Sequence, residues 1–503
     1  MALQFPKLNR KHRGDIQTLR AIAVLLVIAY HLKLIKGGFL GVDIFFVISG
    51  YVITQNLNSS EGNLSSRLKN FYLRRAKRIL PSSLAVILLV AIFSRAYLAP
   101  LYQSRFKVDA LWSSLMGANI GFGIHNLDYL QSTTAPSPFL HYWSLGVEEQ
   151  FYIIWPLIFF AVFINRKRLI FWLLPVAMAG ALFSTNLWPV FSFYLPSSRA
   201  FEFLFGAALV GVGSAKFGKN LLATTGWLGI FASSFLISDQ VANPNLKSLI
   251  PTISTALVIY AGSEVFSLRI LQYIGEISFT LYLVHWPIIL FVGRGNSQLH
   301  GARIWIALLL MALATFLVSV FIEIPFRYEK FGKLSPIGWL AFIGISTLVI
   351  QGIYLIPQKN VVSSFKIDTS SPAVYVNGCH LNQRYSAIPS GCTFGNNGPK
   401  VLLVGDSHAA QWFPALEKIS TLKKISLTSI TKSSCPITVN SIYAAGKLDK
   451  SCDLWHANIL KFINSENFDY IIFSNFDRYG YDVGGKDWLN GVSDFVNKIS
   501  GPA

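Results

Sequence analysis

The strongest constraint on this chain is a series of apolar stretches, each of about 16 to 21 residues, that recurs along its first 356 residues. Hydrophobic residues make up 52% of the 503 residues, and the mean hydropathy is +0.47. A helix needs about 20 apolar residues to cross a bilayer. The chain is therefore predicted to be a polytopic α-helical membrane protein with about eleven spans, ten in a membrane domain and one linking helix. These spans cover 15–33, 38–57, 81–99, 147–164, 168–186, 199–214, 222–238, 247–263, 277–293, 303–323 and 336–356.

Lysine and arginine residues indicate how the predicted spans are oriented. The N-terminal leader and the loops after the even-numbered spans carry nineteen of them, whereas the opposite loops carry five. Cytoplasmic loops are enriched in Lys and Arg, so we predict a cytoplasmic N-terminus and, after an odd number of spans, an extracytoplasmic C-terminal region. The formal net charge of +19 is then mostly a topology signal. It implies contact with membrane lipids and no nucleic-acid partner.

The first predicted span, LRAIAVLLVIAYHL, contains two ionisable side chains, Arg20 and His31. Eleven residues at about 100° each return to nearly the same helix face and separate the two by roughly 16 Å along the axis. Ionisable groups at membrane depth are costly and usually functional; an imidazole can act as a base, and a guanidinium binds anions. The alternative is that Arg20 extends to the inner surface and His31 ends the helix near the outer one. The functional interpretation makes both candidate catalytic residues on one buried path.

After residue 356 the composition changes to that of a water-soluble domain. We expect a linker region over 357–399 and an α/β domain over 400–503. All four cysteines lie in this part, as an oxidising outer compartment permits. A zinc site is the alternative to disulfides, but the spacing contains no C-x-x-C, and we predict no metal. Among three connectivities we favour local pairing, Cys379 with Cys392 and Cys435 with Cys452.

The segment KVLLVGDSHAAQW at 400–412 predicts a short buried strand, a tight turn at Gly405 and the start of a helix. This geometry exposes a serine hydroxyl at the C-terminal edge of an α/β sheet, near helix N-terminal amides that can stabilise an oxyanion. Ser407 is therefore a candidate nucleophile; the alternative is that Asp406 and Ser407 only cap the helix. A second strand, YIIFSN, ends at Asn475, whose amide we expect in the same crevice.

A serine nucleophile needs a base, and no histidine follows His456 in the sequence. Asp453 and His456 have a D-x-x-H spacing, but they precede the YIIFSN strand and lie beside Cys452, so we expect no catalytic use of His456. The chain ends at SGPA before another sheet edge forms. We therefore expect the domain over 400–503 to be incomplete and the natural protein to continue.

Several motifs occur in a specific order: the R-x10-H pair Arg20 and His31, GVDIFFVISGY at 41–51, RRAKRILP at 74–81, LHYWSLGVEEQFYIIWP at 140–156, YIGEISFTLYLVHWP at 273–287 and E-x-P-x-R from Glu323 to Arg327. With this set, the chain resembles the acyltransferase family 3 proteins, integral-membrane enzymes that O-acylate surface carbohydrates. The C-terminal part resembles the SGNH domain fused to one branch of that family. The resemblance implies an acyltransferase-3-like membrane domain over 1–335, an additional linking helix over 336–356 and an SGNH-like α/β domain outside.

The resemblance also implies a donor and further site residues. The donor would be cytoplasmic acetyl-CoA, and the basic residues Arg74, Arg75 and Arg78 would bind its phosphates, the alternative being ordinary inner-surface charge. Five internal polar residues are candidates for orienting His31 or the substrate, although packing or helix-dipole roles are an alternative explanation. They are Glu148, Glu149, His285, Glu323 and Arg327.

The leading hypothesis is a two-stage transacylase in the bacterial inner membrane, with a periplasmic C-terminal domain. The membrane domain takes acetyl from acetyl-CoA through His31, and the outer domain passes it through Ser407 to a surface polysaccharide or lipid-linked sugar such as lipopolysaccharide O-antigen. Peptidoglycan and exopolysaccharide acceptors stay open. A transporter or flippase with a docking tail is an alternative from another class, but no inverted repeat is evident in the sequence. An outward esterase is a third.

Overall fold

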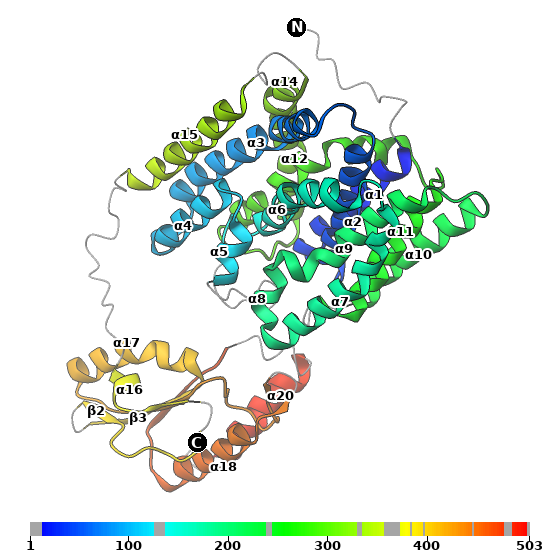
Figure 1. Ribbon diagram of the computed structural model, residues 1–503. Helices are drawn as coiled ribbons and strands as arrows, with labels where there is room; N and C mark the ends of the chain where they lie inside the picture. Colours follow the sequence, from blue (N-terminus) through cyan, green and yellow to red (C-terminus); the bar gives the residue numbers. More distant parts are fainter. Residues whose placement is uncertain are drawn as a thin grey trace. The chain divides into compact units, whose positions relative to one another are not determined.

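The computed structural model divides into two compact units, Met1–Gln358 and Lys359–Ala503 (Figure 1). The first unit is helical, and the second contains a sheet with helices packed on it. Expectations about the basic residues before Arg13 and about linker residues 357–372 lie outside the described residues. The structure describes residues 13–124, 136–237, 244–328, 334–356, 373–382, 385–395, 398–444, 447–476 and 485–499.

Each of the eleven predicted spans overlaps a helix of the first unit. In the described part of the chain, eight helical segments are long and apolar enough to cross a membrane. Helices α9, α10 and α11 fall outside that criterion, so the number of eleven spans stays a prediction. The helices are α1 (Gly14–His31), α2 (Gly41–Asn58), α3 (Leu64–Tyr97), α4 (Gln103–Ser114), α5 (Ala118–Ile124), α6 (Tyr142–Ile158), α7 (Ile170–Leu187), α8 (Pro189–Tyr194), α9 (Pro196–Val212), α10 (Lys219–Leu236), α11 (Leu249–Ala261), α12 (Arg269–Val292), α13 (Ala302–Val318), α14 (Ile324–Tyr328) and α15 (Pro336–Leu355).

Helix α3 is longer than the span predicted within it. It begins at Leu64, where the Asn63 side chain caps it by accepting a hydrogen bond from the Ser66 amide (2.8 Å). Its 34 residues extend for about 51 Å at 1.5 Å per residue, well beyond a hydrocarbon core of about 30 Å. The basic cluster at 74–78 therefore belongs to the same continuous helix as the apolar span. Its side chains have fixed angular positions on that helix.

Helices α2 and α9 pack with their backbones in close approach, because each has a glycine at the crossing. A Cβ atom on Gly50 would stand 1.9 Å from the Phe203 carbonyl oxygen, and one on Gly206 would stand 1.9 Å from the Val47 carbonyl oxygen. Small residues at such crossings are typical of membrane helices. A buried ion group joins the same two helices: the Arg199 guanidinium lies 3.3 Å from Asp43 and 3.1 Å from Glu202.

The second unit is an α/β domain around a sheet of order β1-β4-β3-β7, in which the four strands of this path are parallel and β2 pairs antiparallel with β4. Helix α17 covers one face, and α18 and α20 lie on the other (Figure 1). Both expected disulfides, Cys379–Cys392 and Cys435–Cys452, are present. The elements are α16 (Ala373–Val376), β1 (His380–Leu381), β2 (Thr393–Gly395), β3 (Lys400–Gly405), α17 (Ser407–Lys423), β4 (Ser426–Lys432), β5 (Tyr443–Ala444), β6 (Lys447–Leu448), α18 (Lys450–Ser465), β7 (Tyr470–Ser474) and α20 (Gly485–Val496).

Replacing Gly206 by alanine should destabilise the helical unit, because the new methyl group forces α9 away from α2. Overpacking of this kind typically costs about 1–3 kcal/mol. Gly180→Ala in α7 is the matched control, since a Cβ at this position would meet no described atom within 4 Å and alanine favours a helix by about 1 kcal/mol. Thermal unfolding of the detergent-solubilised protein should give a lower Tm for Gly206→Ala only. Equal Tm values for both variants would contradict the close approach.

Candidate active site

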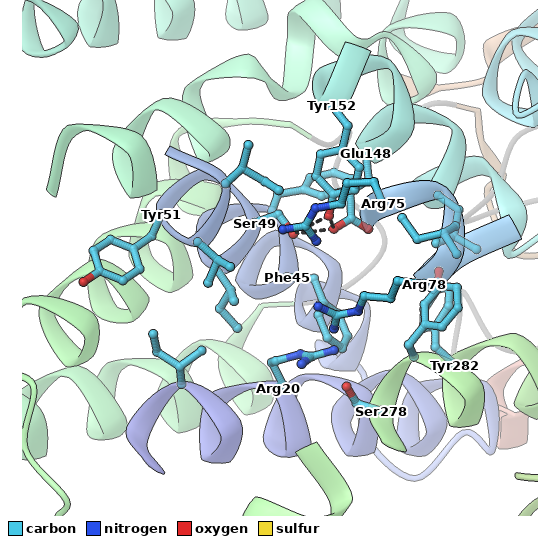
Figure 2. Close-up of a pocket in the computed structure, with 18 of the residues that line it drawn as sticks. Arg20, Phe45, Ser49, Tyr51, Arg75, Arg78, Glu148, Tyr152, Ser278 and Tyr282 are labelled. Carbon is cyan, nitrogen blue, oxygen red and sulfur yellow. Dashed lines mark hydrogen bonds between the residues drawn. The ribbon is translucent and has the colours of Figure 1, made fainter. Parts of the chain in front are cut away.

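A cavity of about 470 Å³ lies in the helical unit, and five arginine side chains line it, of which Figure 2 labels Arg20, Arg75 and Arg78. Arg13 is the N-cap residue of α1. Arg20 comes from α1, Arg75 and Arg78 from α3, and Arg327 from α14. Residues three apart share a helix face, so α3 presents Arg75 and Arg78 together. Arg74, one position earlier, is exposed and does not line the cavity. The structure thus brings together two of the three predicted phosphate-binding arginines with Arg20, and it leaves Arg74 outside.

The cavity carries an excess of positive charge. Arg78 is repelled by Arg20, Arg327 and Arg75, and among its neighbours Glu323 attracts it. Glu323 is not among the residues that line the cavity; it accepts a hydrogen bond from Thr280 on α12 (2.6 Å) and pairs with Arg327 (3.2 Å). The E-x-P-x-R motif therefore uses its glutamate to hold its arginine at the cavity. This arrangement suits an anionic ligand.

Glu148 is the carboxylate that lines the cavity. It accepts hydrogen bonds from Ser49 on α2 and from Tyr152, one turn along α6 (Figure 2). Arg75 lies over the Tyr152 ring at 5.1 Å from its centroid. Glu149 does not line the cavity, and its buried Oε1 has no hydrogen-bond partner among the described residues. Adjacent positions on a helix point about 100° apart, which separates these two predicted site residues.

His31 lies in a second polar cluster, apart from the cavity that Arg20 lines. Its Nδ1 is 3.1 Å from Nε2 of His285, and its ring packs on Trp286 with centroids 4.6 Å apart. A third imidazole, that of His141, packs edge-on against His285 with centroids 5.6 Å apart. All three histidines are buried. From the sequence we predicted His31 and His285 as site residues; His141, in the LHYWSLGVEEQ motif, is a structural neighbour of His285 that the sequence analysis did not place there.

The LVHWP motif explains how α12 holds two of these imidazoles. Pro287 has no N–H, so the Leu283 carbonyl one turn earlier lacks its usual helical donor. Nε2 of His141 lies 2.9 Å from that carbonyl and takes the place of the missing donor. Nδ1 of His285 lies 2.5 Å from the Tyr282 carbonyl. Pro287 thus frees the Leu283 carbonyl for His141, and the Tyr282 carbonyl accepts from His285.

Tyr282 connects the two polar regions of the helical unit. Its side chain lines the arginine cavity, and its hydroxyl lies 2.6 Å from the Ser144 hydroxyl and donates to the His141 carbonyl (3.1 Å). Its own carbonyl accepts from His285. The path predicted between Arg20 and His31 is therefore not one open cavity. It is a cavity followed by a packed polar wall.

In the second unit, the GDSH turn has the predicted strand-turn-helix geometry. Gly405 has φ +150°, and a Cβ there would stand 2.0 Å from the Ser474 carbonyl oxygen. Asp406 caps α17 by accepting from the His408 amide (2.8 Å), and it also accepts from the Phe476 amide beyond β7 (2.8 Å). The capping role belongs to Asp406 alone. Ser407 is the first residue of α17, at the C-terminal edge of the parallel strands.

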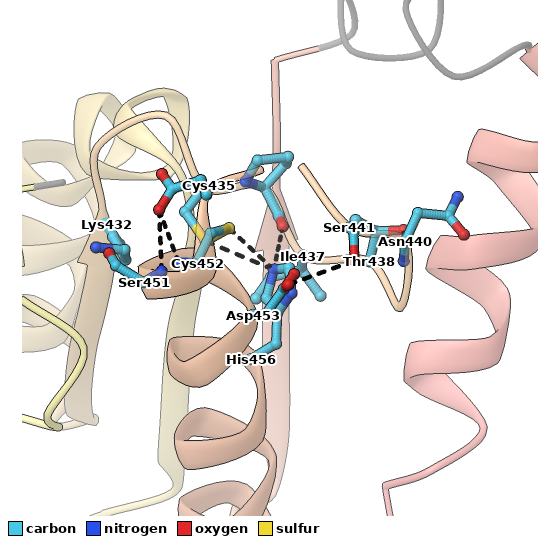
Figure 3. Close-up of a disulfide and its surroundings, with 12 residues drawn as sticks. Lys432, Cys435, Ile437, Thr438, Asn440, Ser441, Ser451, Cys452, Asp453 and His456 are labelled. Atoms are coloured by element: carbon cyan, nitrogen blue, oxygen red, sulfur yellow. Dashed lines mark hydrogen bonds between the residues drawn. A yellow bond between two sulfur atoms is a disulfide. The ribbon is translucent and has the colours of Figure 1, made fainter. Parts of the chain in front are cut away.

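Asn475 and His456 each have hydrogen-bond partners in the loop after β4. Asn475 accepts from the Ile437 amide (2.9 Å) and donates to its carbonyl (3.5 Å), so its amide holds the loop after β4. His456 packs against the Cys435–Cys452 disulfide, with Nε2 2.7 Å from the Pro436 carbonyl (Figure 3). The two sulfur atoms are bonded to each other, in line with the disulfide expectation and against the zinc alternative. His456 therefore has a structural role beside the disulfide.

Comparison with known proteins matches both units. The family model of an acyltransferase domain (Acyl_transf_3) matches residues 13–324, and that of the SGNH domain fused to AT3 domains matches residues 378–499. The chain belongs to the acyltransferase 3 family. It is a multi-pass membrane acyltransferase of the O-acetyltransferase type with a C-terminal SGNH domain. Membership favours the enzyme over the transporter alternative.

Relatives of this acyltransferase include two that are named for peptidoglycan. "Peptidoglycan O-acetyltransferase OatA" of Listeria monocytogenes is 32% identical over 72% of this chain and 67% of its own length. "Putative peptidoglycan O-acetyltransferase YrhL" of Bacillus subtilis is 32% identical over 65% of this chain and 57% of its own length. A Staphylococcus aureus protein, "Putative O-acetyltransferase SAS0844", is 30% identical over 65% and 59%. The chain thus covers less than two thirds of the length of the latter two relatives. No solved structure matches it.

Acidification should destabilise the SGNH unit. Burial lowers the pKa of His456 and of His380, whose imidazole binds the hydroxyls of Thr431 and Ser433. A histidine in an unfolded chain has a pKa of about 6.5. As the pH falls from about 7.5 to 5, the unfolded chain takes up protons that the folded unit resists, so the free energy of unfolding decreases.

The whole protein is incubated in increasing concentrations of urea at both pH values. Cleavage of the SGNH unit by an added protease reports the fraction of that unit that is unfolded. The urea midpoint should fall at low pH, and His456→Gln should reduce the size of that fall. A midpoint that rises on acidification is inconsistent with a lowered pKa for the buried His456 and the half-buried His380.

Proposed function

We propose that this acyltransferase moves an acetyl group from cytoplasmic acetyl-CoA across the bacterial cytoplasmic membrane to a hydroxyl of a cell-envelope carbohydrate. The observation that carries the proposal is the pairing, on helix α1, of Arg20 in the arginine-lined cavity with His31 in the histidine cluster. The cavity suits the anionic part of the donor, and the imidazole suits the acyl transfer itself. The N-terminus is cytoplasmic and the SGNH domain lies outside in this proposal.

The cavity charge supports CoA as the carrier of the acyl group. CoA bears phosphate groups, and guanidinium groups bind phosphates through paired, charge-assisted hydrogen bonds. Arg75 and Arg78 come from the part of α3 that extends beyond the predicted span 81–99, which is on the proposed cytoplasmic side. A donor entering from the cytoplasm would meet them together with Arg20 and Arg327.

The transfer proceeds in two stages in this proposal. His31 promotes the release of the acetyl group from the thioester sulfur in the membrane domain. The Ser407 hydroxyl of the SGNH domain then carries the acetyl group as an ester and passes it to the acceptor hydroxyl. Peptidoglycan is the acceptor that the names of OatA and YrhL support. Lipopolysaccharide O-antigen, the acceptor first considered from the sequence, is the alternative outcome of the test.

Replacing His31 or Ser407 by alanine should abolish acetylation of the acceptor, because each change removes a reacting group. Base-labile acetate is measured on purified peptidoglycan and on lipopolysaccharide from cells that carry each variant, with membrane abundance of the protein measured in parallel. His300→Ala, at an exposed loop histidine, is the control and should retain acetylation. Unchanged acetate in the His31→Ala strain at normal abundance would refute the proposed function.

The arginine cavity gives a prediction that separates neighbouring residues. Arg75→Ala and Arg78→Ala should each raise the KM for acetyl-CoA by about tenfold to a hundredfold, since each loses a charged hydrogen bond to phosphate of about 1.5–3 kcal/mol. Arg74→Ala is the matched control, because this arginine is exposed outside the cavity, and its KM should stay within about twofold. The assay follows release of the CoA thiol by isolated membranes. Equal effects of all three substitutions point to general surface charge instead.

A further inference from the structure

We infer that His285 is a positioning residue for His31: it fixes which ring nitrogen of His31 carries the proton. The inference rests on the proposed role of His31. Nε2 of His285 lies 3.1 Å from Nδ1 of His31, and the two residues stand on different helices, α12 and α1. His285 is completely buried, and His31 is 6% exposed. A contact between two buried imidazoles requires one to donate and the other to accept.

The backbone of α12 decides the direction of this hydrogen bond. Nδ1 of His285 lies 2.5 Å from the Tyr282 carbonyl, and a carbonyl oxygen only accepts, so Nδ1 of His285 carries the proton. In the neutral imidazole Nε2 then holds a lone pair. His31 must therefore donate, which places its proton on Nδ1 and its own lone pair on Nε2.

Helix α1 supports the same assignment. The Val27 carbonyl, one turn before His31, is a second acceptor for this imidazole. Side chains on a helix lean back over the preceding turn, and Nδ1 is the ring nitrogen closer to the backbone. The rings of Trp286 and Tyr30 pack against His31, with centroids 4.6 and 5.3 Å away, and restrict its rotation.

The consequence is that Nε2 is the nitrogen of His31 that reacts. As a base it takes the proton of an acceptor alcohol, whose oxygen attacks the acetyl carbonyl carbon and receives the acetyl group. The new C–O bond forms as the C–S bond breaks, and the electron pair of that bond leaves with sulfur. The CoA thiolate then takes the proton from Nε2, so His31 returns to its starting tautomer and no proton is gained or lost.

His141 provides a matched control for this inference. Like His285, it is a buried histidine whose ring nitrogen lies within hydrogen-bond distance of a carbonyl on α12, at 2.9 Å from Leu283. Its ring packs on His285, and its Nε2 is directed to the α12 backbone, whereas Nε2 of His285 is directed to His31. A merely structural effect of losing a buried imidazole should therefore be similar in His141→Ala and His285→Ala.

The first test measures CoA-thiol release by membranes, normalised to inserted protein. His285→Ala should lower kcat by about a hundredfold, the scale of general-base catalysis, and leave the KM for acetyl-CoA within about threefold, since the cavity is separate. His141→Ala should keep kcat within about threefold. His285→Gln, whose side-chain oxygen can accept from Nδ1 of His31, should keep more activity than His285→Ala. Equal kcat losses in the His141 and His285 alanine variants overturn the inference.

The second test is a chemical rescue. Nδ-methylhistidine introduced at position 31 by codon reassignment blocks Nδ1 and forces the lone pair onto Nε2. In the His285→Ala background the methyl group has the space that the His285 ring vacated, so activity should rise at least tenfold over His285→Ala alone.

The two proposals fail in different ways. Activity that survives in His31→Ala refutes the proposed function itself. Loss of activity in His31→Ala and His285→Ala, with no recovery when Nδ-methylhistidine replaces His31, refutes only the positioning role of His285.

Discussion

The cost of burying charge among apolar helices shapes the membrane unit. A charged group there loses water and must find its partners within the protein. Arg199 meets Asp43 and Glu202, Glu323 meets Thr280 and Arg327, and Glu148 meets Ser49 and Tyr152. Against this pattern, the cavity concentrates guanidinium groups in excess of carboxylates. The surplus marks the place where a ligand supplies the missing negative charge.

Features that depend on local sequence could be predicted well. Apolar stretches of bilayer length located the helices, because a helix satisfies its backbone groups within one segment. The strand-turn-helix at Gly405 followed from the order of apolar residues, glycine and a capping aspartate. The disulfides Cys379–Cys392 and Cys435–Cys452 were favoured as local pairs among three connectivities, and both are present. In each case the residues that decide the structure are close together in the chain.

The candidate site depends instead on angles and on distant pairs, which a single sequence leaves open. In the sequence, nothing distinguishes the three arginines of the basic cluster. Only the orientation of α3 in the structure shows that Arg75 and Arg78 face the cavity and Arg74 does not. His31 and His285 are 254 positions apart. The amide of Asn475 forms hydrogen bonds with the loop at Ile437, which the sequence did not predict, and its place in the catalytic crevice stays a prediction. A local signal for His141 did exist: the missing N–H of Pro287 leaves a carbonyl that needs a donor.

The placement of Arg20 and His31 on one helix favours a particular kind of donor. Eleven residues separate them by roughly 16 Å along α1, and Tyr282 with its neighbours stands between the cavity and the histidine cluster. A compact anion bound by the arginines would not reach the imidazole. A donor that is long, with phosphates at one end and the reactive carbonyl at the other, has the length to match both positions. A thioester of CoA has this form, so the spacing on α1 itself supports the donor that we propose.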